Sequence, residues 1–136
     1  MRDWLKAFLA GFLSTLIFHQ GTVAILHFAG YLPRVPFSLA PTVPFGAPQV
    51  ISLAFWGGLW GIPLWLTIRD SRGMKYWRSA LLFGAILPSL VAWFVVAPLK
   101  GLPVAGGWKP ANILTALLLN GAWGVGVGLL MKLLRR

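Results

Sequence analysis

Near the end of the chain, residues 111–131 read ANILTALLLNGAWGVGVGLLM, a run without a charged side chain that lies between Lys109 and Lys132. The hydrocarbon core of a bilayer is about 30 Å thick, and roughly 20 helical residues cross it. Three further uncharged stretches have a similar length, at about 7–28, 49–68 and 79–97. The chain is therefore predicted to be an all-α integral membrane protein, a single membrane domain over residues 1–136 with four transmembrane helices.

The composition excludes an ordinary soluble fold. Of the 136 residues, 58% are hydrophobic and 10% are charged, whereas a typical soluble domain has about 25% charged residues. The mean hydropathy is +0.79. A formal net charge of +10 would by itself suggest nucleic-acid binding. Here the basic residues flank the apolar runs, which a lipid bilayer explains, so we expect the bilayer as a partner and no nucleic acid.

Groups that carry chemistry are scarce. The chain has no cysteine, which excludes disulfides and thiolate chemistry. Its two acids, Asp3 and Asp70, lie outside the four predicted spans, so a pair of carboxylates inside the membrane cannot act in acid–base catalysis. We expect no catalytic residue, no metal ion and no cofactor, and the chain is not predicted to be an enzyme.

The distribution of basic residues predicts the orientation. Cytoplasmic segments of membrane proteins are enriched in Lys and Arg. Both termini and the connection 69–78 would lie on one side and the other two connections on the opposite side. The first side carries nine basic residues and the second carries three. We therefore predict that both termini and a basic loop at 69–78 are cytoplasmic, and we expect a bacterial inner membrane. The nine are Arg2, Lys6, Arg69, Arg72, Lys75, Arg78, Lys132, Arg135 and Arg136, and the three are Arg34, Lys100 and Lys109.

The outer connection, residues 29–48, is rich in proline. Proline fixes φ and lacks a backbone donor, so this density opposes both helix and sheet. Two interpretations remain open: an extended cap at the membrane surface, or a re-entrant segment that lines a cavity between helices. The prolines are Pro33, Pro36, Pro41, Pro44 and Pro48.

The second and fourth spans resemble each other. Residues 56–61, WGGLWG, match residues 119–124, LNGAWG, in a register that aligns Trp60 with Trp123 and Gly61 with Gly124. Each half of the chain would then be a helical hairpin, and the two hairpins would form a parallel repeat about an axis along the membrane normal. The matched segment is short, so a chance similarity is the alternative.

Small residues predict where helices approach closely. Gly57 and Gly61 form a G-x-x-x-G pattern in the second span, and Gly124 and Gly128 form another in the fourth. Such patterns let two backbones come together in a bilayer, where lipid tails offer no hydrophobic drive for association. They serve either the contacts within one four-helix bundle or the face of a homodimer.

Residues near one depth inside the predicted spans form a candidate midplane belt, in which the two tryptophans lie two to three residues deeper than the other members. Polar side chains at this depth are costly and usually face the protein interior. One interpretation is structural: His19 or Gln20 would bond with Asn120 and so fix the arrangement of the first and fourth spans. The other is a polar path or small-solute site. The belt consists of His19, Gln20, Asn120, Trp60, Trp123 and Pro88.

These features favour a function that needs no reactive group. Our leading hypothesis is a structural or accessory membrane subunit that packs in a homo-oligomer or a larger membrane complex. The alternative is an oligomeric channel or transporter for a small ion or neutral solute, based on the midplane belt and the repeat. The two differ in whether His19 and Asn120 face a water-accessible cavity.

Overall fold

The computed structural model describes residues 1–43 and 45–136, and over these ranges the chain forms helices and no strand. Four of its helical segments are long and apolar enough to cross a membrane: 3–28, 49–68, 73–99 and 110–134. The predicted all-helical architecture with four long apolar helices is thus confirmed. The elements are α1 (Asp3–Ser14), η1 (Thr15–His19), α2 (Gln20–Phe28), α3 (Gln49–Ile68), α4 (Gly73–Val91), η2 (Ala92–Val96), α5 (Ala97–Leu99), η3 (Val104–Trp108) and α6 (Pro110–Leu134).

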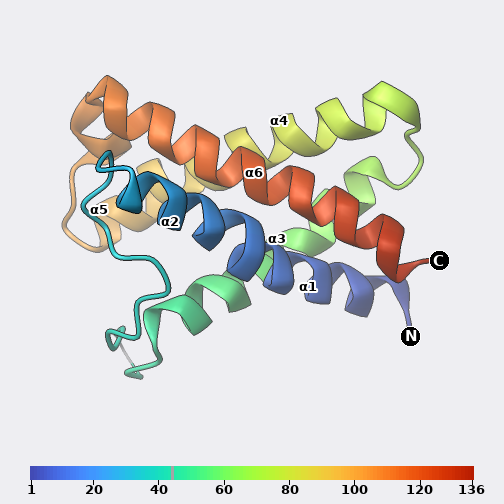
Figure 1. Ribbon diagram of the computed structural model, residues 1–136, viewed down its shortest axis with the longest axis horizontal. Helices are drawn as coiled ribbons and strands as arrows, with labels where there is room; N and C mark the ends of the chain where they lie inside the picture. The colour runs from blue at the N-terminus through green and yellow to red at the C-terminus, as the bar shows by residue number, and fades with distance from the viewer. Residues whose placement is uncertain (44) are drawn as a thin grey trace.

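The four long segments run lengthwise along the molecule (Figure 1). Both chain termini and the turn between α3 and α4 lie at one end, which we name the terminal end. The connections 29–48 and 100–109 lie at the opposite end, which we name the loop end. Two helix pairs carry most of the packing, α1 with α3 and α4 with α6, and α6 also packs along α1 and η1. Neighbouring helices in space therefore lie in the order α3, α1, α6, α4.

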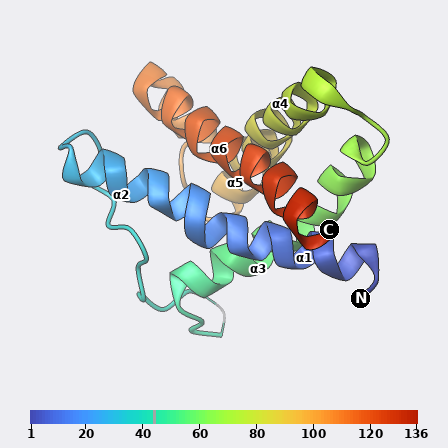
Figure 2. The same cartoon turned by 45° about the vertical axis from the view of Figure 1, so that its right-hand side comes forward.

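The hydrophobic core lies toward the terminal end. There the two helix pairs meet, and α3 makes its smaller contact with α4. Toward the loop end α2 and the first turns of α6 diverge (Figure 2). The helices are thus packed together at the terminal end and lie further apart toward the loop end. The buried core residues are Ala7, Ala10, Leu64, Trp65, Ile68, Tyr76, Ala80, Trp123, Val127 and Met131.

Residues 73–78, which the sequence assigns to the basic loop 69–78, are helical. α4 begins at Gly73, whose φ of +59° is accessible to glycine at little cost. The first turns of α4 pack on α6 because Tyr76 is buried and its hydroxyl donates to the carbonyl of Gly128 at 2.6 Å. Aromatic packing therefore extends the third helix beyond its uncharged stretch.

Two of the long segments contain a turn of π-helix in their loop-end halves. η1 interrupts the first segment, and η2 interrupts the third between Pro88 and Pro98. A proline cannot donate to the carbonyl four residues earlier, so Pro88 and Pro98 each remove one helical hydrogen bond from this segment. Turns of this kind occur as bulges inside α-helices, and many lie at functional sites.

The connection between α2 and α3 folds back along α2. The backbone N–H of Phe37 donates to Oε1 of Gln20 at 2.8 Å. Gln20 precedes the end of α2 at Phe28 by eight residues, or about 12 Å of helix. Further along, Ser38 and Ala40 accept from the first N–H groups of α3, at Val50 and Gln49, which would otherwise lack partners. Of the prolines in this connection, Pro44 lies outside the described residues.

Candidate functional site

The polar side chains of the midplane belt form two separate clusters rather than one. Nδ2 of Asn120 donates to the hydroxyl of Ser89 at 2.9 Å, which links α6 to α4. The predicted contact of Asn120 with His19 or Gln20 is therefore wrong. The physical reason is the orientation of α6: the backbone at Asn120 and Gly124 lies directly against Gly84 of α4. The side chain at position 120 is consequently on the α4 side, away from the first span.

His19 and Gln20 form a second polar cluster on the first span. Nε2 of Gln20 lies 3.1 Å from Nδ1 of His19, and the side-chain oxygen of Gln20 accepts from the backbone N–H of Phe37. Gln20 is buried, with 2% of its surface exposed. This cluster joins the first span to the connection 29–48.

Trp123 makes the link between the first and fourth spans that was expected of Asn120. Its indole N–H donates to the carbonyl of Gly11 at 3.1 Å, and its own carbonyl accepts from the hydroxyl of Ser14 at 2.6 Å. Both bonds are buried, so two polar contacts join α1 to α6 in the core. Trp60, aligned with Trp123 in the sequence, instead packs edge-on against Phe83 of α4 with ring centroids 6.3 Å apart.

Pro88 lies inside α4, next to the Ser89 that receives the Asn120 bond. Because proline has no N–H, the carbonyl of Gly84 loses its usual helical donor. Ser14 and Ser89 are fully buried hydroxyls with a polar partner on another helix. The sequence did not predict these bonds between helices, because serine is common in apolar helices and its spacing carries no signal. In the described part of the chain, no buried side-chain nitrogen or oxygen lacks a hydrogen-bond partner.

The four glycines of the G-x-x-x-G patterns lie in contacts within the chain. An added methyl group at Gly57 would collide with the Thr15 hydroxyl of η1, one at Gly61 with the backbone of α1, and one at Gly124 with the backbone of α4. At Gly128 it would come within 3.2 Å of the Tyr76 ring. Because these glycines have no side chain, α3 can lie close to α1 and α6 can lie close to α4.

The same glycine contacts recur in both helix pairs. Gly61 lies against the carbonyl of Ala7, and Gly124, 63 positions later in the chain, lies against the carbonyl of Ala80. Ala80 in turn stands 73 positions after Ala7. Two more contacts repeat with the same two offsets. Gly11 lies against the carbonyl of residue 57, and Gly84 lies against the carbonyl of residue 120. Gly58 lies against the Phe8 side chain, and Gly121 lies against the Leu81 side chain.

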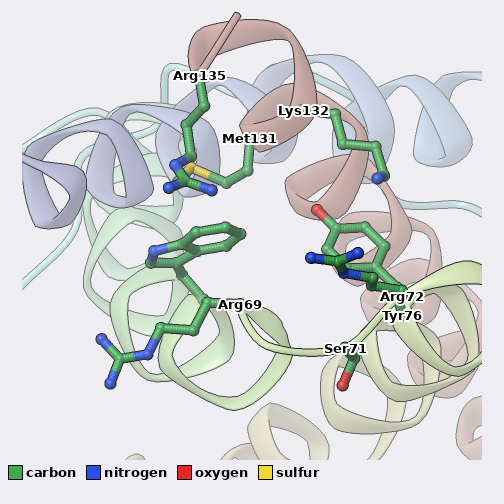
Figure 3. A pocket seen from close by; sticks show the side chains of 8 residues that line it. Arg69, Ser71, Arg72, Tyr76, Met131, Lys132 and Arg135 are labelled. Atoms are coloured by element: carbon green, nitrogen blue, oxygen red, sulfur yellow. The ribbon is translucent and has the colours of Figure 1, made fainter.

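A cavity of about 350 Å³ opens at the terminal end (Figure 3). Sequence reasoning used its basic residues for orientation alone and missed the cavity, because they come from three separate segments. A second, mainly apolar groove of about 300 Å³ lies between α2 and α6 near the loop end. Neither of these two hollows is lined by His19 or Asn120. The first is lined by Trp65, Arg69, Ser71, Arg72, Tyr76, Met131, Lys132 and Arg135, and the second by Leu26, Tyr31, Leu32, Ala111, Leu114, Thr115 and Leu118.

No protein-family model, curated protein or solved structure matches this chain.

Proposed function

We propose that this chain is a structural or accessory subunit of a membrane assembly, inserted through its four long helices with both termini cytoplasmic. The observation that carries the proposal is the internal use of the midplane polar groups. Asn120 bonds to Ser89, and Gln20 bonds to the backbone of Phe37. A site for a polar solute needs groups that are left to bind it, and the Asn120 amide nitrogen and both polar atoms of the Gln20 side chain already have partners within the chain.

The outward surface supports the same proposal. In the four long segments, 17% to 39% of the most apolar window is buried inside the chain. The rest faces outward, and the groove between α2 and α6 adds a concave apolar strip at the loop end. Small membrane helices associate by close packing against such surfaces. A further transmembrane helix seated in the groove would cover Leu114, which is 65% exposed.

The test is site-specific photocrosslinking in native membranes. A photoreactive amino acid replaces Leu114 in the groove or, as the matched control, Leu66 on the outward face of α3, which is 55% exposed. We expect a discrete protein adduct of defined stoichiometry from position 114 and lipid adducts from position 66. Purification in a mild detergent should then yield an assembly larger than the 14.9 kDa chain. Lipid adducts alone at both positions, together with a monomer in the mild detergent, would contradict the proposal.

A channel or transporter is the second candidate, and the repeated glycine contacts favour it. Two like hairpins that meet at one end and diverge at the other resemble the repeat architecture in which secondary transporters place a site between their halves. In that case His19 and Asn120 would be exposed in a second arrangement of the hairpins. The Asn120 variant described in the Discussion separates this candidate from the first.

A further inference from the structure

The cavity at the terminal end gathers positive charge from three segments. Arg69 directly follows α3 and Arg72 directly precedes α4. Lys132 lies in the last turn of α6, and Arg135 directly follows that helix. In Figure 3 the α6 residues Lys132 and Arg135 approach from one side and Arg72 from the other, whereas the Arg69 guanidinium points outward. Trp65 and Tyr76 form the aromatic part of the wall.

The two acids of the chain pair with two of the four cations in this cluster and leave the other two without an acidic partner. Arg69 lies 3.8 Å from Asp70, whose side chain is 94% exposed, and Arg135 lies 3.4 Å from Asp3. Those are the chain's two acidic side chains. Within residues 1–43 and 45–136, Arg72 and Lys132 therefore have no acidic side chain to pair with.

Aromatic rings hold two of the cations in place. Lys132 Nζ lies 4.4 Å from the centre of the Tyr76 ring, and the Arg135 guanidinium lies 4.7 Å from that of Trp65. Each ring is attached to the buried core, with Trp65 5% and Tyr76 3% exposed. Cation–π contacts of this kind orient a charge without neutralising it. The rings therefore hold Lys132 and Arg135 on the cavity wall, and in the described part of the chain Lys132 keeps a positive charge that no acidic side chain pairs with.

Like charges held this close repel one another, and a bound anion relieves that repulsion. We propose that the cavity binds a phosphate group, carried either by the headgroup of an anionic lipid or by free phosphate. A phosphate offers several oxygens around one centre, so it can accept from donors that arrive from different segments, whereas a carboxylate offers two oxygens in one plane. Arginine forks and a lysine ammonium are the side chains that recognise it. The volume of about 350 Å³ admits a phosphate with its attached glycerol.

The test compares two double variants with equal loss of charge. Arg72→Gln with Lys132→Gln removes the two cations of the cavity that lack a carboxylate partner. Lys75→Gln with Arg78→Gln is the control, because both residues lie on the exposed face of the first turns of α4 and outside the cavity. All four side chains are exposed, so each variant should melt close to the wild-type temperature in neutral detergent.

Two probes distinguish the sources of the phosphate. Native mass spectrometry counts phosphatidylglycerol bound to the full chain against phosphatidylcholine, and calorimetry at constant ionic strength measures binding of inorganic phosphate. A lipid site gives selective retention of phosphatidylglycerol, and a free-anion site gives saturable phosphate binding. In either case the cavity variant should bind at least about tenfold more weakly, since each charge-assisted bond is a large part of the affinity, and the control should match the wild type.

Equal weakening in the cavity and control variants would mean non-specific attraction to a basic surface and would overturn the proposal. Wild-type binding by the cavity variant, or no binding of either probe by the wild type, would overturn it as well. These outcomes are independent of whether the chain is an accessory subunit or a transporter.

Discussion

At the residue scale, the bond between Asn120 and Ser89 shows how a polar group is accommodated between apolar helices. Its length is 2.9 Å, and the Ser89 hydroxyl is fully buried. Hydrogen bonds between membrane helices contribute about 0.6 kcal/mol on average and up to about 2 kcal/mol. The loss of one partner also leaves the other unpaired in an apolar environment, which adds to the cost.

We predict that Asn120→Leu and Ser89→Ala each lower the free energy of unfolding by about 1–2 kcal/mol. The double variant should lose less than the sum of the two, because the second substitution removes a group that has already lost its partner. Denaturant unfolding in detergent measures all three variants. Strictly additive losses would mean that the bond contributes nothing.

The same Asn120→Leu variant tests the channel hypothesis when it is reconstituted in liposomes. As an accessory subunit, the chain should show no flux of small ions or neutral solutes, with or without the substitution. A wild-type flux that Asn120→Leu abolishes while the melting temperature changes little would favour the channel and contradict the structural role. His19→Phe, which fills the space without offering a proton site, is the matching variant on the first span.

At the scale of the helices, close backbone contacts define the two pairs. The carbonyl of Ala7 lies against Gly61 and that of Ala80 against Gly124, so a single methyl group at either glycine forces the helices apart. Overpacking of this kind typically costs about 1–3 kcal/mol. Gly21 of α2 has no heavy atom within 4 Å of an added methyl group. It therefore serves as the matched control for a change from glycine to alanine.

We predict that Gly61→Ala and Gly124→Ala destabilise the protein by similar amounts, about 1–3 kcal/mol each. Gly21→Ala should be neutral or stabilising by up to about 1 kcal/mol, because alanine has the higher helix propensity. Thermal unfolding in detergent gives the ranking. If Gly21→Ala destabilised as much as the other two, the effect would come from the general loss of glycine and not from the helix contacts.

At the scale of the whole molecule, the two ends differ in packing and in charge. The terminal end holds the core, both termini and the basic cavity, and the loop end holds the divergent helices and the proline-rich connection. All nine basic residues assigned to the cytoplasm belong to segments at the terminal end. An asymmetry of nine to three in Lys and Arg orients a membrane protein by the positive-inside rule.

We predict that Lys75 is cytoplasmic and Lys109 is external. The chain has no cysteine, so Lys75→Cys and Lys109→Cys each introduce a single reactive site. In intact cells a thiol reagent that does not cross the membrane should label position 109 and not 75, and in permeabilised cells it should label both. Labelling of position 75 but not 109 in intact cells would reverse the orientation.

Several properties followed from the sequence alone because they depend on local composition. The length and hydropathy of the uncharged runs predicted four apolar helices, since a helix satisfies its own backbone hydrogen bonds in the absence of water. The bounds of α3 agree with the predicted 49–68 because Pro48 precedes it and Arg69 follows it. α4 begins earlier than the predicted span because Tyr76 packs on α6, and α1 and α6 extend a few residues beyond the uncharged runs. Whether the chain is inserted as predicted stays a prediction.

The partners of the polar residues were decided by the tertiary structure. Depth along a helix can be counted from the sequence, and it placed Asn120 level with His19 and Gln20. The side of the helix that a residue occupies depends on which neighbour the helix packs against, and α6 turns Gly124 and Asn120 toward α4 and Trp123 toward α1. The basic cavity has the same origin. Arg72 and Lys132 are 60 positions apart in the chain, and they line one cavity because the packing of α4 on α6 brings their segments together.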